Sequence, residues 1–122
     1  MASASGPQGL IDTDILIDAE RAVPQAVTFL AQQLTATGVQ ISIVSAMELI
    51  AGCRNAKELV VVRQFLQSVT VLPLDAQSSQ VGHQLMDAYF LSHGLLIPDA
   101  LIAATALANG LTLYTKTSST FR

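Results

Sequence analysis

Short apolar runs rich in β-branched residues alternate with longer helical segments along this 122-residue chain, and that alternation constrains the fold more than any other feature. The runs have the length of strands, and the longer segments carry the apolar spacing or the end signals of helices. Strands are expected at 9–12, 39–44, 69–74 and 111–115, and helices at 23–38, 45–53, 56–69, 76–94 and 98–110. Such alternation predicts an α/β layer fold with a central, mainly parallel sheet flanked by helices.

The composition bounds the domain organisation and the class of protein. Hydrophobic residues make up 51% of the chain and charged residues 12%, which excludes a disordered protein and a coiled coil. The net charge is −3, so no basic patch indicates a nucleic-acid partner. Residues 1–8 are small, polar and turn-forming, and we expect them to be a flexible N-terminal extension. Residues 9–122 should form one domain.

Cysteine usage and hydropathy indicate the compartment. Cys53 is the one cysteine, so an intramolecular disulfide is impossible and a zinc site of several thiolates is excluded. The most apolar stretch, from Leu95 to Leu111, is interrupted by Pro98 and Asp99. It is shorter than the roughly 20 apolar residues of a membrane span. We therefore expect a cytoplasmic protein with no membrane partner.

Acidic residues stand where the expected strands end or the following helices begin. Asp12 closes the first strand, Glu48 lies one turn into the helix after the second, and Asp99 opens the helix that leads to the last strand. Thr115 ends that last strand. Ligands of parallel sheets bind beyond the carboxyl ends of the strands, so these acids could meet at one edge although they are far apart in sequence.

Each acid also has a purely structural interpretation. Ser45 and Glu48 have the spacing of a capping box, and Asp99 suits the positive end of a helix. Asp14 could cap a following helix. Asp12 is harder to explain, because a carboxylate buried in an apolar strand is costly without a partner. We expect four other acids to be solvated: Asp18, Glu20, Glu58 and Asp75.

A shared cation would explain why such acids converge. Like charges repel, and they persist together when a cation joins them. A ligand set of oxygens, without a cluster of histidine or cysteine, suits Mg²⁺ or Mn²⁺. Two such ions, about 4 Å apart, can activate water and stabilise the leaving oxygen in phosphodiester hydrolysis. The acids therefore indicate metal-dependent hydrolysis of a phosphodiester.

Three segments in this order resemble the PIN-domain family, and specifically its VapC-type toxins from toxin–antitoxin pairs: "LIDTDILID", "SAMELIAG" and "IPDALIAATALANGLTLYT". The resemblance covers about residues 9–122. It implies a three-layer fold and an endoribonuclease that uses Mg²⁺ or Mn²⁺. It also implies a homodimer that acts on RNA and is held inactive by a cognate antitoxin, which would offer an apolar helix and an arginine for the acidic site.

The same resemblance assigns roles to individual residues. It places the catalytic, metal-binding acids of the family on Asp12, Glu48 and Asp99. Asp14 and Thr115 fall on supporting positions near the metal.

The C-terminal segment departs from the family pattern. Thr117 and Thr120 stand where the family has polar or acidic residues, so we expect the fourth carboxylate to be missing and activity to need more metal. The sequence stops at Arg122, where the family commonly adds an edge strand. We expect either a truncated chain or a divergent member.

Other functions remain open at this point. A PIN-like domain without its fourth acid could be a module that binds only RNA or the antitoxin. The run "DTDIL" also fits the opening of haloacid-dehalogenase-like phosphatases, although Lys116 comes late for their lysine and Asp99 stands alone. A receiver domain would need an acceptor aspartate after 39–44, and none follows.

Overall fold

A four-stranded parallel sheet forms the centre of the computed structural model, which describes residues 9–36 and 38–116. Its strands are β1 (Gly9–Ile11), β2 (Gln40–Ser42), β3 (Thr70–Leu72) and β4 (Thr112–Tyr114). Their spatial order is β3-β2-β1-β4, and every neighbouring pair is parallel. Parallel neighbours need crossover connections, which the helices supply. The predicted α/β class is confirmed.

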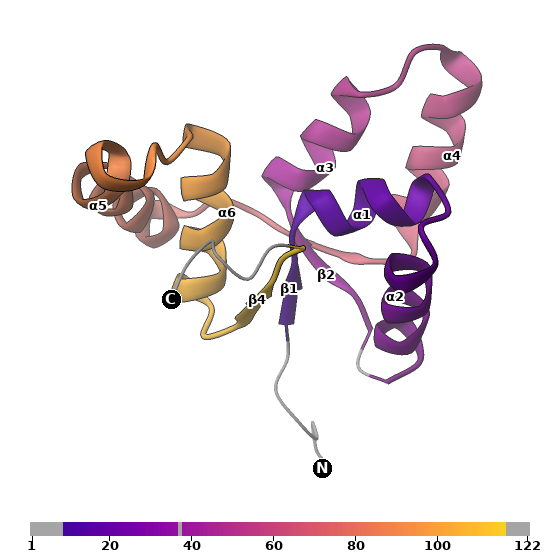
Figure 1. Ribbon diagram of the computed structural model, residues 1–122, viewed down its shortest axis with the longest axis horizontal. Coiled ribbons are helices and arrows are strands. Elements are labelled where there is room, and N and C mark those ends of the chain that lie inside the picture. The colour runs from indigo at the N-terminus through magenta and orange to yellow at the C-terminus, as the bar shows by residue number, and fades with distance from the viewer. Residues whose placement is uncertain (1–8, 37, 117–122) are drawn as a thin grey trace.

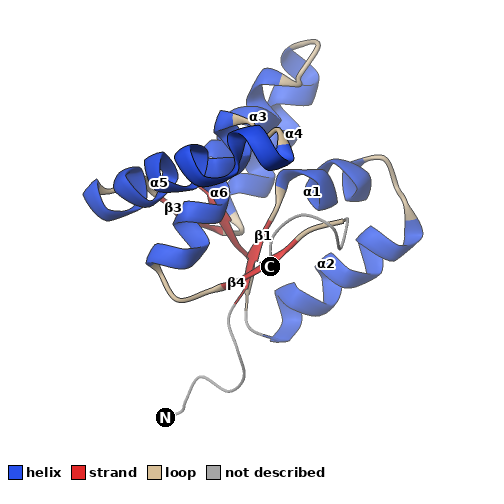
Figure 2. Cartoon of the chain, turned by 60° about the vertical axis from the view of Figure 1, so that its left-hand side comes forward, coloured by secondary structure: helices blue, strands red, loops and turns tan. Residues whose placement is uncertain are grey.

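Helices cover both faces of this sheet. They are α1 (Thr13–Glu20), α2 (Pro24–Ala36), α3 (Ile43–Ala51), α4 (Ala56–Gln67), α5 (Ala76–His93) and α6 (Ile97–Ala108). Figures 1 and 2 show α5 and α6 on one side of the strands, with α1 and α2 on the other. The result is the expected arrangement in three layers.

Alternating side chains of the strands divide the core in two. Ile11 and Ile41 face a cluster that includes buried residues of α1, α2, α3 and α4. Leu10 faces the opposite way and packs with Val44 and Ile102, in a cluster that α6 helps to build. Successive residues of a strand point to opposite faces, so three-residue strands are enough to hold the two helical layers together.

Capping side chains set two helix starts that differ from the sequence predictions. Helix α1 was not predicted, and it begins because Asp12 is its N-cap and accepts a hydrogen bond from the Thr13 amide at 2.7 Å. Helix α3 begins at Ile43, because the Ser42 hydroxyl accepts from the Val44 amide at 3.0 Å. Two structural interpretations are therefore wrong: Asp14 does not cap α1, and Ser45 with Glu48 does not form a capping box.

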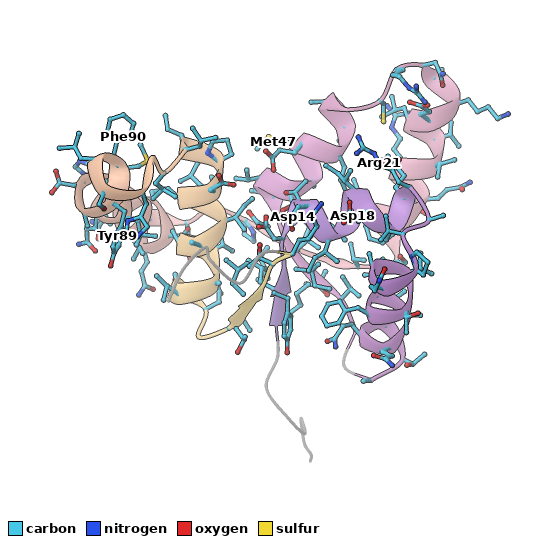
Figure 3. All side chains as sticks on the ribbon, viewed as in Figure 1. Asp14, Asp18, Arg21, Met47, Tyr89 and Phe90 are labelled. Atoms are coloured by element: carbon cyan, nitrogen blue, oxygen red, sulfur yellow. The ribbon has the colours of Figure 1, made fainter. Side chains whose placement is uncertain are left out.

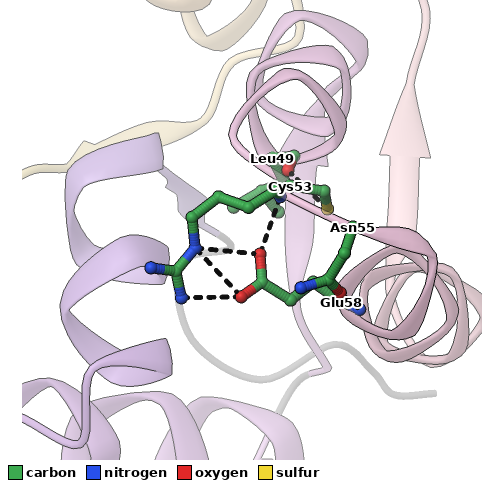
Figure 4. A network of polar contacts seen from close by, with 5 residues as sticks. Leu49, Cys53, Asn55 and Glu58 are labelled. Carbon is green, nitrogen blue, oxygen red and sulfur yellow. Dashed lines mark hydrogen bonds and ion pairs between the residues drawn. The ribbon is translucent and has the colours of Figure 1, made fainter.

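The acids expected to be solvated include three that have partners. Asp75 caps α5 in a capping box with Ser78. Figure 4 shows Glu58 where α3 turns into α4, accepting from the Arg54 amide at 2.8 Å and forming a 2.7 Å ion pair with its guanidinium. Asp18 pairs with the Lys116 ammonium at 3.2 Å. These contacts fix helix ends and corners.

Close packing between β1 and β4 positions the end of the sheet. A Cβ atom at Gly9 would lie 1.9 Å from the Tyr114 ring, so only glycine allows this approach. The Asp12 amide then donates to the Tyr114 carbonyl at 2.9 Å and prolongs the ladder by one residue. Asp12 is thereby held beside the end of β4.

Two regions discussed above lie outside the described residues: the expected extension 1–8, and Thr117 and Thr120, where the fourth carboxylate was sought. Among the residues that are described, no helix is both long enough and apolar enough to cross a membrane.

Candidate active site

Carboxylates from the starts of α1 and α6 and from the middle of α3 line one hollow of about 500 Å³ beyond the carboxyl ends of β1 and β2. Asp12, Asp14, Glu48 and Asp99 are all part of its lining. Figure 3 shows Asp14 just above β1, where α1, α3 and α6 face one another. The structure therefore places Asp12, Glu48 and Asp99 in the lining of one hollow, together with Asp14, which the sequence analysis expected as a supporting residue.

The start of α1 presents Asp12 and Asp14 to this hollow. One carboxylate oxygen of Asp12 accepts the capping hydrogen bond from the Thr13 amide. Asp14 lies in the first helical turn, where the helix dipole favours negative charge. Thr115 donates from its hydroxyl to Asp14 at 3.3 Å, and the Lys116 amide donates at 3.4 Å. These two long hydrogen bonds connect Asp14 to the end of β4.

Asp12 is the acid most strongly affected by its surroundings. Burial raises its pKa from 3.8 to about 6, and the negative charges of Asp14 and, to a smaller extent, Asp99 add to that rise. Hydrogen bonds from the Thr13 amide and from Thr115 act in the opposite direction. The raised pKa shows that these favourable contacts do not offset burial and repulsion.

Asp99 reaches the same hollow from the first turn of α6. No side chain caps this helix, and Pro98 stands in its first turn, so the Asp99 carboxylate lies where free amides and the helix dipole attract an anion. Burial raises the pKa of Asp99, followed in importance by the charges of Glu48 and then Asp14. The acids therefore repel one another across the hollow.

Glu48 is held by residues that the sequence analysis did not identify as part of the site. The Thr13 hydroxyl donates to Glu48 Oε1 at 2.6 Å, and the Ser45 hydroxyl oxygen lies 2.8 Å from the same Thr13 oxygen. Thr13 is 7% exposed and Ser45 is fully buried. Thr13 follows an aspartate and Ser45 precedes Glu48 by three residues, but neither position predicts a contact between α1 and α3.

The donors fit a divalent cation in chemistry. They are oxygens only, and none of the described residues that line the hollow is cationic. A hard divalent ion would offset the burial of charge and the mutual repulsion that together raise the pKa of Asp12 and Asp99. The side chains do not form a closed cage: across 9–36 and 38–116, no three acidic, histidine or cysteine side chains lie close enough to hold one ion. The metal-binding roles of Asp12, Glu48 and Asp99 stay predictions.

Thr115 lies between the acidic hollow and a neighbouring hollow. It contacts Asp14, yet it lines a neighbouring hollow of about 400 Å³ on the other side of α1, together with Phe29, Tyr114 and Lys116. The side chain of Thr115 is not part of the lining of the acidic hollow, and its predicted supporting role would act through Asp14 and Asp12.

Comparisons with known proteins place this fold and site in a family. The family model that describes the PIN domain matches residues 9–116. Ribonuclease VapC10 of Mycobacterium tuberculosis is 36% identical over 107 residues, which cover 87% of this chain and 80% of that protein.

Solved structures agree with the sequence comparison. A toxin–antitoxin complex from Klebsiella pneumoniae contains a chain that is 27% identical, with a TM-score of 0.75, over 92% of this chain and 88% of that one. FitAcB from Neisseria gonorrhoeae is 26% identical, with a TM-score of 0.67, over 89% and 87% of the two chains. The protein therefore belongs to the PIN-domain family and, within it, to the VapC-type proteins.

Proposed function

We propose that this protein is an endoribonuclease that uses Mg²⁺ or Mn²⁺ and acts as the toxin of a type II toxin–antitoxin pair. The observation that carries the proposal is the acidic hollow, in which burial and repulsion raise the pKa of Asp12 to about 6. Family membership supplies the reaction class, because the curated relative is named a ribonuclease.

In this proposal Asp12, Glu48 and Asp99 hold the metal ions. When bound, the metal supplies an activated water and stabilises the oxygen that leaves phosphorus. The cap engages Oδ1 of Asp12, so Oδ2 is the oxygen that would bind an ion. Asp14, tied to the end of β4, orients Asp12 and the water around it. The acids repel a bare phosphate, so RNA should bind only when metal has neutralised the hollow.

An antitoxin is the proposed regulatory partner, since the Klebsiella pneumoniae neighbour was solved as a toxin–antitoxin complex. An apolar hollow of about 220 Å³ between α1, α2, α3 and α4 supports docking of an apolar segment, and its lining includes Leu16, Leu30, Leu49 and Phe65. An arginine on the same segment could pair with the acidic hollow.

The protein is also proposed to form a homodimer. Large apolar side chains remain exposed at the end of α5 and the start of α6, where Leu91 is 95% exposed. Phe90, which points outward from α5 in Figure 3, Leu96 and Ile97 are each more than half exposed. Light scattering should detect a dimer, and a monomer at high protein concentration would contradict this part of the proposal.

Cleavage of total cellular RNA, followed by mapping of new 5′ ends, tests the activity. The wild type should cleave RNA in the presence of Mg²⁺ or Mn²⁺, and addition of EDTA should stop the cleavage. Asp14→Asn should retain measurable activity, reduced by about 10–100-fold because it acts through another ligand. Asp12→Asn should have none. Asp87→Asn, an exposed acid on α5, is the matched control and should cleave like the wild type.

Two results would refute the nuclease. Equal cleavage by Asp12→Asn and the wild type would identify the activity as a contaminant. If the wild type binds RNA or an antitoxin but never cleaves with either metal, the protein is the non-catalytic binding module instead.

A further inference from the structure

We propose that Thr13 is a positioning residue whose hydroxyl fixes the Glu48 carboxylate for metal binding, with Ser45 supporting it from below. The inference rests on the proposed metal-dependent function, because it concerns how one metal-binding acid is oriented. It assigns a task to two buried hydroxyls that lie on different helices and meet only in the folded protein.

The contact geometry is that of a strong hydrogen bond. Thr13 Oγ1 and Glu48 Oε1 are 2.6 Å apart, a distance typical of a hydroxyl that donates to a charged carboxylate. The Thr13 side chain is 7% exposed, so little water competes for its proton. This bond joins α1 to α3 across 35 positions of sequence.

The number of hydroxyl protons determines which group donates in each of these two hydrogen bonds. A threonine hydroxyl has one proton and can accept as well as donate. If that proton goes to Glu48, the contact of 2.8 Å between the Thr13 and Ser45 oxygens requires Ser45 to be the donor. Ser45 therefore donates to Thr13, and Thr13 donates to Glu48. A hydroxyl that also accepts a hydrogen bond is a better donor.

Glu48 needs such a tether because of its surroundings. Its side chain has several rotatable bonds, and its negative charge is close enough to Asp99 to help raise the pKa of that carboxyl. Without a fixed partner, repulsion would favour rotamers that turn the carboxylate out of the hollow. The Thr13 bond engages one oxygen and leaves the second available to an ion.

Substitution of Thr13 by valine tests this role, because it removes the hydroxyl and keeps the branched shape. Thr13→Ser keeps the hydroxyl and should behave like the wild type. Thr105→Val is the matched control: Thr105 is fully buried, and its hydroxyl donates to the Leu101 carbonyl within α6 at 2.8 Å. Thr13→Ala removes the same hydroxyl in a smaller side chain, should the valine variant not fold.

Two measurements do not depend on RNA cleavage. Calorimetric titration with Mn²⁺ alone should show an affinity about 10–100-fold lower in Thr13→Val than in the wild type. The second measurement is the NMR spectrum of metal-free protein with isotope-labelled glutamate. In Thr13→Val, the methylene signals of Glu48 should indicate an average over several rotamers, whereas in the wild type they should indicate one. Thr13→Ser should restore both, and Thr105→Val should change neither.

In the cleavage assay, Thr13→Val should raise the Mn²⁺ concentration for half-maximal activity, and saturating metal should restore most of the rate. Unchanged Mn²⁺ affinity with a lowered melting temperature would show a structural role only and overturn the inference. If the wild type binds Mn²⁺ but cleaves no RNA, the proposed activity fails while the titration still decides the role of Thr13.

Discussion

Replacing Asp12 by asparagine should make the protein more stable in EDTA at neutral pH. A carboxyl whose pKa is higher in the folded protein than in the unfolded chain binds its proton more tightly when folded. The pKa of Asp12 is raised from 3.8 to about 6. The free energy of unfolding should therefore decrease as the pH rises from about 4 through 6, and asparagine removes that loss.

The size of the effect follows from the same values. A shift of about two pKa units corresponds to at most about 3 kcal/mol at pH 7. Asp12 is only partly buried, and solvent screening reduces the expected gain to about 1–2 kcal/mol. Asparagine is as good an N-cap as aspartate, so the hydrogen bond to the Thr13 amide should survive the substitution.

Urea unfolding in EDTA, repeated from pH 4 to pH 8, measures the difference. The two proteins should be equally stable near pH 4 and should diverge above pH 5, with the same dependence on urea. Asp12→Ala separates charge from capping, because it removes the buried charge but should lose about 1 kcal/mol of capping.

Addition of Mn²⁺ should reverse the order of stability. A ligand at 100 times its dissociation constant stabilises the folded state by about 2.7 kcal/mol, and only the wild type should gain it. If Asp12→Asn is less stable than the wild type at pH 7 in EDTA, or if the difference does not depend on pH, the cost of burying the Asp12 charge beside other acids does not govern the stability of the metal-free protein.

Further predictions concern the surroundings of the site. Like Asp12→Asn, Asp99→Asn should make the metal-free protein more stable than the wild type, by an amount that increases as the pH rises. The same urea series would detect this difference. Gly9→Ala should lower the free energy of unfolding by about 1–3 kcal/mol, since its Cβ would lie 1.9 Å from the Tyr114 ring; a smaller side chain at Tyr114 should recover part of the loss, and no recovery would contradict this packing. Lys116→Met should cost less than about 1 kcal/mol, because its ion pair with Asp18 is 53% exposed on the lysine side, and any measured loss should shrink as salt is added.

Local signals explain why much of the fold could be predicted from the sequence. Pro24 begins α2, and Gly94 ends α5 with a positive φ of 62°. Pro98 stands in the first turn of α6. Each of these residues acts through its own backbone, so the signal is present before any tertiary contact forms.

The errors arise where several residues could do the same task. Ser42 and Ser45 are both residues that could cap a helix, and the structure has Ser42 as the N-cap of α3. Asp12 reads as the last residue of a strand, yet its side chain starts the unpredicted helix α1. Thr13 was not identified because its partners lie 32 and 35 residues away. Charged residues indicate a site by their cost of burial, whereas a hydroxyl indicates nothing until its neighbours are known.

The pairing of β1 with β4 affects how the protein folds while it is being synthesised on the ribosome. Gly9 pairs with Thr112, and Asp14 contacts Thr115 across 101 positions. Closing a loop of about 100 residues costs roughly 4 kcal/mol of chain entropy, so this edge should be among the last parts to form. We expect nascent chains arrested before Thr112 is exposed to lack Mn²⁺ binding and longer ones to acquire it. A nuclease that assembles its site only after β4 has been synthesised would spare the messenger RNA and the ribosome while the preceding residues are being made.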